Sequence, residues 1–345
     1  MPISNELLSS TLYSIRDGEV DELFQRVPFL DFAKKLGGIE YEDGGIKIQR
    51  PLAVSQHSTI TQLATGYEPV SLAAQDVMQP ALYEWADFVA PIVITKKEEL
   101  ENSGEKAIVK IVEARMRNVM GLLRREINKQ LVASNSTVLT SLLSLNGDPV
   151  SGITTGFLQQ GAPTAAGQTN TVGGLARSLV PDGYGLFNRS FNSNNLFGTD
   201  GIRGMHQLAA ETSARAPMGE IKLILASENG YANYRRSLFQ QERYVDEKQL
   251  NAGFMSLAFG NAAVVQDVFM PKVADMDTGG TNANTMYMIN FDGIKLVMHS
   301  DGDLAVSPFE YIPGTTARSA QIYWKGQLIA DNLASCAVLY NGEGY

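Results

Sequence analysis

A long amphipathic helix, predicted between residues 98 and 132, is the feature that most constrains how this chain can fold. Apolar residues recur there at steps of three and four. They are Ile108, Ile111, Val112, Met116, Val119, Met120, Leu123, Ile127 and Leu131. This spacing predicts one apolar stripe along a helix. Residues 105–131 would span roughly 40 Å at 1.5 Å per residue.

The opposite face of this predicted helix is basic, although the whole chain has a net charge of −9. Its charged residues are the cations Lys106, Lys110, Arg115, Arg117, Arg124, Arg125 and Lys129 and the acids Glu105, Glu113 and Glu126. Seven cations minus three acids leave this face at +4. The bland interpretation is a solvated helix face. The functional one is a face turned toward a polyanion or toward an acidic segment of the protein.

Residues 41–95 are predicted to form a long two-stranded arm. Asp43-Gly44-Gly45 predicts a turn, and residues 46–49 alternate apolar and polar side chains as strands do. A second strand is predicted at residues 83–94, where Phe88, Ala90, Ile92 and Ile94 alternate. About forty residues without a clear helix separate the two strands, which is unusual inside a compact domain. Because an isolated hairpin is at best marginally stable in water, we expect this arm to be satisfied only by a second copy of the chain.

The charge pattern of this arm is one-sided. No lysine or arginine occurs from Pro51 through Thr95, so the acids Glu68, Asp76, Glu84 and Asp87 are expected to be unopposed. An ordinary solvated loop explains this pattern, because such loops are common. The sharper hypothesis is a tip that docks on a basic surface of a neighbouring copy.

The rest of the chain predicts an α+β fold. We expect a helix over residues 205–214, a buried strand over 221–226 with Ser227 capping the next helix, and a strand at 264–265. Asp292-Gly293 predicts a hairpin turn between strands at 286–291 and 294–298. Residues 319–340 contain two further strand-like runs. The order of elements, with helices first and strands last, suggests that the two ends of the chain together build one domain and that a second domain is inserted between them.

Composition limits the classes of function. The chain has 345 residues, of which 44% are hydrophobic and 19% charged, which is typical of a globular protein. An acidic protein is a poor general binder of nucleic acid, although it can enclose DNA as a container. The single cysteine, Cys336, excludes an internal disulfide. No secretion signal or membrane span is visible.

The sequence contains almost no motif that indicates catalysis or ligand binding. The sequence has no phosphate-binding or dinucleotide-binding glycine motif, and no nucleophile elbow. His57, His206 and His299 lie far apart, without zinc spacing. We therefore predict no catalytic, cofactor-binding or metal-binding residues, and a protein that is not an enzyme. A Cys336–histidine dyad formed by folding, and a metal shared between subunits at Asp301 and Asp303, stay open as minor alternatives.

Several phrases resemble the major capsid proteins of tailed bacteriophages, which share the HK97-like fold. Those phrases are Pro28-Phe-Leu30, Gly44-Gly45, Ile48-x-x-Pro51-Leu52, the stretch from Tyr83 to Glu99, Gly173-Gly174 followed by Arg177, Gly253-Phe-x-x-Leu257-x-Phe-Gly260, Val264-Val-x-Asp267 with Pro271, Tyr287-x-Ile-Asn-Phe, and Ile322 to Leu339 with Gly326-Gln327. No single phrase is diagnostic, but together they follow the family's order over most of the chain.

The resemblance implies an organisation. It assigns an N-terminal arm to residues 1–40, an extended loop to 41–95, an axial domain to 151–284, and a peripheral domain with a spine helix to 96–150 and 285–345. It also implies hexamers and pentamers of an icosahedral shell that closes around double-stranded DNA, bound without sequence specificity. A portal and separate scaffold or decoration proteins are implied partners, with no cofactor and no membrane. The virion capsid, assembled in the host bacterial cytoplasm, is the expected location.

The arm and the basic helix supply the candidates for contacts between subunits, namely Glu68, Asp76, Glu84, Arg115, Arg117, Arg124 and Arg125. Some family members cross-link neighbours through a lysine in the extended loop. Residues 51–95 contain no lysine, so we expect a non-covalent shell. With the spine helix beginning near residue 100, we also expect no long N-terminal scaffold segment. The alternatives are an encapsulin-type compartment with the same fold and, from another class, an enzyme with an unfamiliar site.

Overall fold

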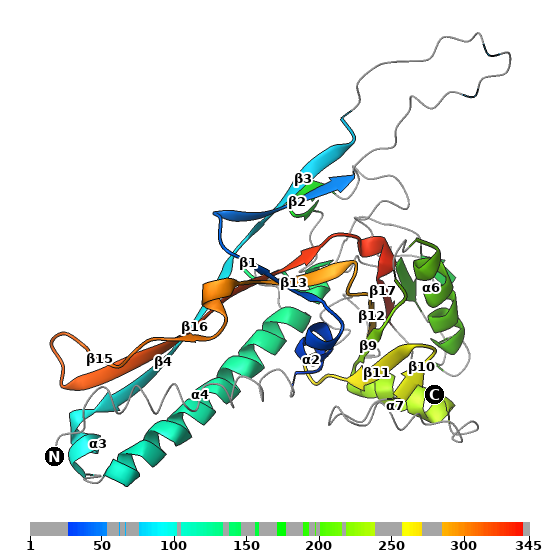
Figure 1. The fold of residues 1–345 in the computed structure, drawn as a ribbon. Coiled ribbons are helices and arrows are strands. Elements are labelled where there is room, and N and C mark those ends of the chain that lie inside the picture. The colour runs from blue at the N-terminus through cyan, green and yellow to red at the C-terminus, as the bar shows by residue number, and fades with distance from the viewer. Residues whose placement is uncertain are drawn as a thin grey trace.

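The computed structural model describes residues 27–53, 62, 66, 76–101, 105–133, 138–145, 156–158, 171–176, 189–192, 197, 201–215, 219–238, 257–270 and 285–340. Their helices are α2 (Pro28–Lys35), α3 (Lys96–Glu101), α4 (Glu105–Ala133), α5 (Leu142–Leu145), α6 (Ile202–Arg215) and α7 (Glu228–Ser237), with single 3₁₀ turns η5 (Ser300–Gly302) and η6 (Leu333–Ser335). The mixture of helix and sheet confirms the predicted α+β class (Figure 1).

The predicted long helix is present as α4, which extends over 29 residues. Its apolar stripe is buried, as the spacing predicted. The fully buried members are Val112, Met116, Met120, Leu123, Ile127 and Leu131. Figure 1 shows α4 running alongside two long strands, β4 and β16, so the helix supports one sheet along its length.

That sheet has six strands and is built around one long strand, β16 (Ala317–Ala330). Its strand order is β1 (Ile39–Glu42), β13 (Ile294–His299), β16 and β14 (Ala305–Val306), with β15 (Glu310–Tyr311) and β4 (Ala86–Thr95) also paired to β16. β4 runs antiparallel to β16 over its whole length, from Ala86 opposite Gly326 to Thr95 opposite Ala317. Alternate β4 residues, among them Ile92 and Ile94, join the core that α4 covers.

A second sheet has seven strands. Its order is β10 (Leu257–Phe259), β11 (Ala262–Gln266), β9 (Leu223–Ala226), β12 (Met286–Ile289), β17 (Ala337–Tyr340), β8 (Arg189–Asn192) and β5 (Gly156–Leu158). Both of its faces are buried. Leu223 and Leu225 point into the core shared with α2 and the six-stranded sheet, whereas Ile224 and Ala226 pack with residues of α6 and α7. This explains why β9 is a continuous apolar run without alternation.

Two short hairpins complete the fold, β2 (Lys47–Ala53) with β3 (Met78–Glu84), and β6 (Thr171–Val172) with β7 (Leu175–Ala176). The β2–β3 hairpin stands away from both large sheets at one end of the elongated subunit (Figure 1). It follows the predicted turn, where Gly44 and Gly45 both have positive φ angles of 132° and 115°. Glycine tolerates that region because it lacks a Cβ atom.

The predicted strand over residues 83–94 is wrong as a single strand. The chain divides at Trp85 into β3, which pairs with β2, and β4, which pairs with β16. The expectation that the whole segment 41–95 is satisfied only by a second copy is therefore wrong for β4, which is an integral strand of its own chain.

The hairpin predicted across Asp292-Gly293 is also wrong. β12 and β13 flank these residues but lie in different sheets, and Gly293 is not among the glycines with positive φ. The glycine is needed for a close approach instead, because a Cβ there would lie 2.3 Å from the carbonyl oxygen of Asn332.

Several local predictions are confirmed. Helix α6 and strands β9 and β11 occupy the expected positions. Ser227 caps α7 by accepting a hydrogen bond from the backbone N–H of Gly230, at 3.2 Å. The two strand-like runs expected in residues 319–340 are β16 and β17, which are separated by η6.

Candidate assembly surfaces

The β2–β3 hairpin has two different faces. Cross-strand partners share a face, so register assigns every residue. One face is directed toward the body of the subunit and contains the buried Ile48, Leu52, Ala81 and Tyr83. The other face contains Lys47, Gln49, Pro51, Ala53, Met78, Pro80, Leu82 and Glu84. All of these are exposed except Ala53, which is half-buried, and five of the eight are apolar.

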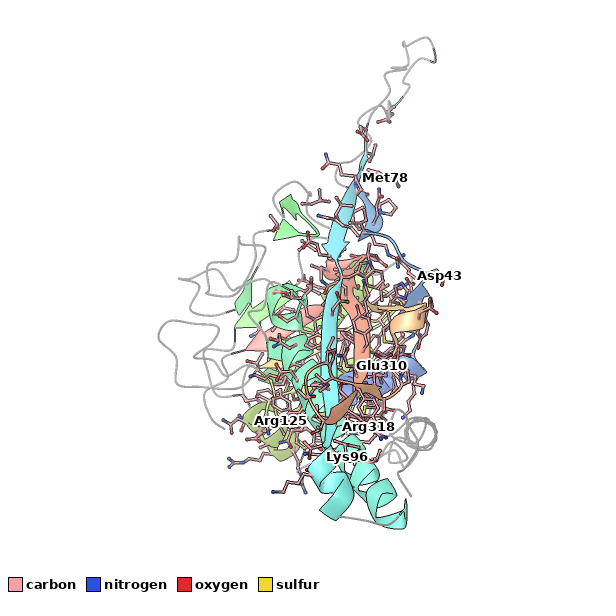
Figure 2. All side chains as sticks on the ribbon, turned by 90° about the vertical axis from the view of Figure 1, so that its left-hand side faces the viewer. Asp43, Met78, Lys96, Arg125, Glu310 and Arg318 are labelled. Atoms are coloured by element: carbon pink, nitrogen blue, oxygen red, sulfur yellow. The ribbon has the colours of Figure 1, made fainter. Side chains whose placement is uncertain are left out.

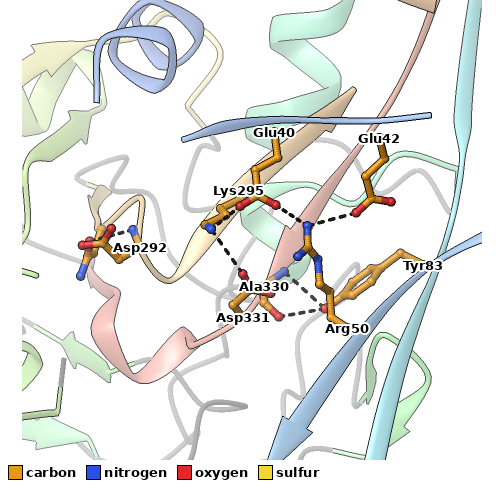
Figure 3. Close-up of polar contacts among 9 residues, drawn as sticks. Glu40, Glu42, Arg50, Tyr83, Asp292, Lys295, Ala330 and Asp331 are labelled. Atoms are coloured by element: carbon orange, nitrogen blue, oxygen red, sulfur yellow. Dashed lines mark hydrogen bonds and ion pairs between the residues drawn. The ribbon is translucent and has the colours of Figure 1, made fainter. Parts of the chain in front are cut away.

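A charged cluster joins the base of this hairpin to the six-stranded sheet (Figure 3). Arg50 of β2 donates hydrogen bonds to Glu40 and, at 3.2 Å, to Glu42, both on β1. Lys295 of β13 also donates to Glu40, and its ammonium lies 4.0 Å from the carboxylate of Asp331. The cluster therefore links three strands and the end of a fourth through groups that are half-buried.

The cluster shifts the acidity of its carboxyl groups in opposite directions. Burial alone would raise the pKa of Glu40, but hydrogen bonds and charge from Lys295 and Arg50 outweigh it and lower the pKa below 4.5. Asp331 is more deeply enclosed, so burial raises its pKa despite the attraction of Arg50 and Lys295. Glu40 is thus the ionised centre of the cluster.

Two uncharged contacts fix the same hairpin. The Tyr83 hydroxyl donates to the carbonyl oxygen of Ala330 at 3.2 Å and accepts from the N–H of Ala330 at 3.3 Å. On the outer edge of β3, the N–H of Leu82 donates to the carbonyl oxygen of Gly173 at 2.8 Å. Gly173 is also required sterically, because a Cβ there would lie 2.6 Å from Ala81.

Gln327 holds the junction where the hairpin meets the sheet. Its amide nitrogen donates to the carbonyl oxygens of Glu84 at 2.6 Å and Val138 at 2.9 Å. Its amide oxygen accepts from the N–H of Thr140 at 2.8 Å and of Leu328 at 3.0 Å. One buried side chain therefore connects the end of β3, strand β16 and the segment after α4.

Arg115, predicted to contact a neighbouring subunit, is used within its own chain. Its guanidinium donates to the carbonyl oxygen of Val93 on β4 and to the carboxylate of Glu98. Glu98 also accepts from the N–H and hydroxyl of Thr95, at 3.0 Å and 2.9 Å. These contacts hold the start of α3 against α4 and lower the pKa of Glu98 to about 2, with the Arg115 hydrogen bond as the largest cause.

A pH dependence follows from this lowered pKa. Because the folded pKa lies below the usual glutamate value of 4.5, ionised Glu98 stabilises the folded state above pH 4.5, and this stabilisation is lost as the pH falls toward 2. We expect Glu98→Gln to destabilise the chain at pH 6 and to unfold like the wild type near pH 2. Urea denaturation over this range measures both effects. A difference between the two proteins that does not shrink on acidification would contradict the assignment.

The expectation that the acids of the arm are unopposed is wrong for Glu84 and Asp87. Glu84 lies 2.9 Å from the ammonium of Lys47 on the paired strand. Asp87 lies 3.8 Å from Lys325 and accepts a 2.6 Å hydrogen bond from Tyr323. Asp76 is exposed just before β3, and Glu68 lies outside the described residues.

The remaining candidate arginines are distributed along α4. Arg117 and Arg125 are exposed, and Arg124 is partly buried. The Arg125 guanidinium lies over the ring of Phe269, 5.8 Å from its centroid. In Figure 2, Arg125 and α4 lie on one side of β4, and Glu310 of β15 lies on the other. The basic face of α4 is therefore separated from the outer face of the sheet.

The described part of the chain offers no assembled chemical centre. In it, no three histidine, cysteine, aspartate or glutamate side chains cluster in a way that could hold a metal ion. None of its helices is long and apolar enough to cross a membrane. Cys336 is fully buried, and burial raises the pKa of its thiol to about 11, so it is an inert packed side chain.

Sequence reasoning missed the residues that position the hairpin. Arg50, Glu40, Lys295 and Asp331 come from distant parts of the chain, and no local pattern connects them. One signal was present, because Arg50 is the last cation before the segment that lacks them.

Comparison with known proteins supports the fold. No protein-family model and no curated protein sequence matches this chain. Among solved structures, it is similar to the capsid asymmetric unit of cyanophage A-1(L), with 17% identity, a TM-score of 0.60, and 93% of this chain and 94% of that chain covered. The capsid of an empty GTA particle gives 9% identity, a TM-score of 0.55, and coverage of 90% and 89%. An encapsulin complex from Synechococcus elongatus PCC 7942 gives 10% identity, a TM-score of 0.49, and coverage of 89% and 86%.

The class of fold follows from these findings. The chain has the HK97-like fold of capsid shell proteins. The sequence-based prediction of that fold is confirmed.

Proposed function

We propose that this chain is the major capsid protein of a tailed bacteriophage, which self-assembles into hexamers and pentamers of an icosahedral shell around double-stranded DNA. The observation that carries the proposal is the projecting hairpin. Its inner face is anchored to its own subunit through Arg50 and Tyr83, while its outward apolar face stays exposed. Exposed contiguous apolar surface of this kind marks a site of protein interaction, and the fold is that of shell subunits.

The proposal includes partners and location. The shell holds DNA without reading its sequence, carries a portal, and is built with or without separate scaffold and decoration proteins. The chain performs no catalysis and needs no cofactor or membrane. It is assembled in the cytoplasm of the host bacterium and ends in the virion capsid.

The same proposal keeps the domain assignment made from the sequence. Residues 1–40 form an N-terminal arm, 41–95 an extended loop, 96–150 with 285–345 a peripheral domain, and 151–284 an axial domain. Within it, Glu68, Asp76 and Glu84 on the loop and Arg115, Arg117, Arg124 and Arg125 on α4 are candidates for contacts between subunits. For Glu84 and Arg115, such contacts would have to compete with Lys47 and Glu98 of the same chain.

Expression of the full chain followed by electron microscopy tests the proposal directly. We expect closed shells, or hexamers and pentamers that close when scaffold is supplied. A protein that elutes from size-exclusion chromatography only as a monomer or dimer under both conditions would contradict it. Particles from the native source that enclose a protein cargo and no DNA would indicate an encapsulin-type compartment instead.

The chemistry of the arm predicts a shell without covalent links. Residues 51–95 supply no lysine amine for an isopeptide bond to a neighbour. We expect assembled particles boiled in SDS to release a single band at the 37.5 kDa mass of the monomer. A ladder of multimers would show that another nucleophile forms the link.

A further inference from the structure

A buried carboxyl group joins helix α4 to the seven-stranded sheet. Asp267, which directly follows strand β11, is 3% exposed, and Asn128 in the second half of α4 is 6% exposed. The amide nitrogen of Asn128 lies 3.1 Å and 3.0 Å from the two carboxyl oxygens of Asp267. The backbone N–H of Phe269 donates to one of these oxygens at 2.8 Å. One polar contact therefore links the helix to the end of a strand far along the chain.

The amide of Asn128 is only half satisfied in this arrangement. Its oxygen Oδ1 is buried and has no hydrogen-bond partner among the described residues. A carboxylate accepts hydrogen bonds but cannot donate one, so ionised Asp267 can pair only with the amide nitrogen. A protonated carboxyl group can also donate, and a half-turn of the Asn128 amide brings Oδ1 to that proton. Acid and amide then form two hydrogen bonds in opposite directions, and the buried oxygen is satisfied.

No counter-charge neutralises an ionised Asp267 in the described part of the chain. The charged residues of the helices packed around this point are Arg124, Arg125, Glu126 and Lys129 on α4, Asp31, Lys34 and Lys35 on α2, and Glu228 on α7. Within the described residues, none of them forms an ion pair with the carboxyl group of Asp267. Burial therefore raises the pKa of Asp267 above the usual 3.8, although hydrogen bonds from Phe269 and Asn128 oppose the shift.

We propose that Asp267 and Asn128 form a pH-dependent joint, which closes as a reciprocal acid–amide pair when Asp267 is protonated and weakens when Asp267 ionises. The ionised form buries an anion without a counter-charge and an amide oxygen without a donor, and both are unfavourable. The inference goes beyond the proposed shell function and does not depend on it, because the joint lies within one subunit.

Helix α4 has a second attachment, which responds to pH in the opposite direction. Arg115 in the first half of the helix donates to Val93 of β4 and to Glu98, and the pair with Glu98 holds while that carboxylate is ionised. The pKa of Glu98 is lowered to about 2, whereas that of Asp267 is raised, so both attachments are intact together only in mildly acidic solution. At higher pH the helix keeps its attachment to β4 and loses part of its attachment to the end of β11.

Hydrogen exchange measures the opening of this joint. The folded chain holds the Asp267 proton more tightly than the unfolded chain, so protonation stabilises the closed joint. That stabilisation is complete below pH 3.8 and is lost as the pH rises through the raised pKa of Asp267. One linked proton changes the opening equilibrium by at most about tenfold per pH unit in this interval and leaves it constant above it. Mass spectrometry of the full chain follows amide exchange in residues 120–133 and 262–270.

Asp267→Asn should remove the pH dependence, because an amide can donate to Asn128 as the protonated acid does but never ionises. The two proteins are compared at equal pH, which cancels the pH dependence of chemical exchange. We expect the wild type to exchange like the variant at about pH 4 and faster than the variant at about pH 8. A wild type that is protected as well as Asp267→Asn, or better, at the higher pH would overturn the inference.

Exchanging the two side chains gives a reciprocal test. Asn128→Asp alone should steepen the pH dependence, because two buried carboxyl groups then face each other and their ionised forms repel. Asn128→Asp combined with Asp267→Asn restores one acid and one amide, so its pH profile should return to that of the wild type. Asn118→Asp is the matched control, since Asn118 is exposed on the same helix, and it should leave the profile unchanged. A double variant as steep as Asn128→Asp would contradict the pairing.

The wild type decides the question even if a variant fails to fold. Relative to strand β16, residues 120–133 and 262–270 should lose protection as the pH rises from about 4 to about 8. Constant or increasing protection in both segments would refute the joint. These outcomes are separate from the proposed function: normal shells with a flat profile would remove only the joint, and a pH-dependent profile in a chain that forms no shells would remove only the shell function.

Discussion

Gln327→Leu is expected to lower the free energy of unfolding by roughly 3–5 kcal/mol, since each buried polar group left without a partner costs about 1–3 kcal/mol. Leucine has nearly the same volume as glutamine but cannot form hydrogen bonds. The substitution would remove the hydrogen bonds that Gln327, which is 3% exposed, makes with the carbonyl oxygens of Glu84 and Val138 and the N–H of Thr140. Urea denaturation of the full chain measures the change.

Gln321→Leu is the matched control for this prediction. Gln321 lies on the same strand, β16, but its side chain is exposed. The same substitution there should change the free energy of unfolding by less than about 0.5 kcal/mol, as surface substitutions usually do. Equal effects at the two positions would show that the Gln327 hydrogen bonds contribute little.

The position of Gln327 explains why its loss should also impair assembly. Glu84 is the last residue of β3, and Ala86 begins β4, so the glutamine holds the point where the hairpin leaves the sheet. The charged cluster of Arg50 and Glu40 constrains the other strand of the hairpin. Together these contacts set the direction of the apolar face before a second copy arrives. Such preorganisation reduces the entropy that association has to overcome.

The elements that the sequence predicted well are those with a strong local period. Helix α4 repeats its apolar residues over many turns, and burial of Met116, Met120 and Ile127 follows directly from that spacing. Helix α7 was located by its cap, Ser227. In both cases the determining interactions lie within a few residues along the chain.

Strand partners could not be predicted, because alternation defines a strand but not its neighbour. Nothing in the sequence of residues 83–94 marks a break at Trp85, although the two halves pair with β2 and with β16. The candidate site was limited for the same reason. Candidate contact residues between subunits were chosen from the sequence by their charge alone. The structure pairs Arg115 with Glu98 and Glu84 with Lys47, and these pairs depend on how the chain folds.

Asp292-Gly293 shows how a strong local turn signal can mislead. The dipeptide favours a two-residue hairpin because glycine accepts positive φ, and strands do flank it on both sides. The chain instead passes from one sheet to the other at this point. The carbonyl oxygen of Gly293 accepts hydrogen bonds from the N–H groups of Asp331 at 2.9 Å and Asn332 at 3.0 Å. Glycine is therefore required at position 293 because of its long-range contact with Asp331 and Asn332 and not because of a turn.

Gly293→Ala is expected to destabilise the chain by at least about 3 kcal/mol, the upper range for overpacking a well-packed site. The new Cβ would lie 2.1 Å from Oγ of Ser335 and 2.3 Å from the backbone oxygen of Asn332. A side chain could rotate away, but the Asn332 backbone can move only by breaking the two hydrogen bonds that join it and Asp331 to Gly293. Urea denaturation measures the loss.

Gly121→Ala provides the same substitution with the opposite expected sign. Gly121 lies within α4, where an added Cβ meets nothing within 4 Å. Alanine in a helix interior is favoured over glycine by roughly 0.5–1 kcal/mol, since the unfolded chain loses less entropy on folding. We therefore expect Gly121→Ala to raise the free energy of unfolding while Gly293→Ala lowers it. A neutral Gly293→Ala would show that the close approach of Gly293 to the Asp331–Asn332 segment contributes little to stability. These contacts would then not fix the orientation of the six-stranded sheet relative to the seven-stranded sheet.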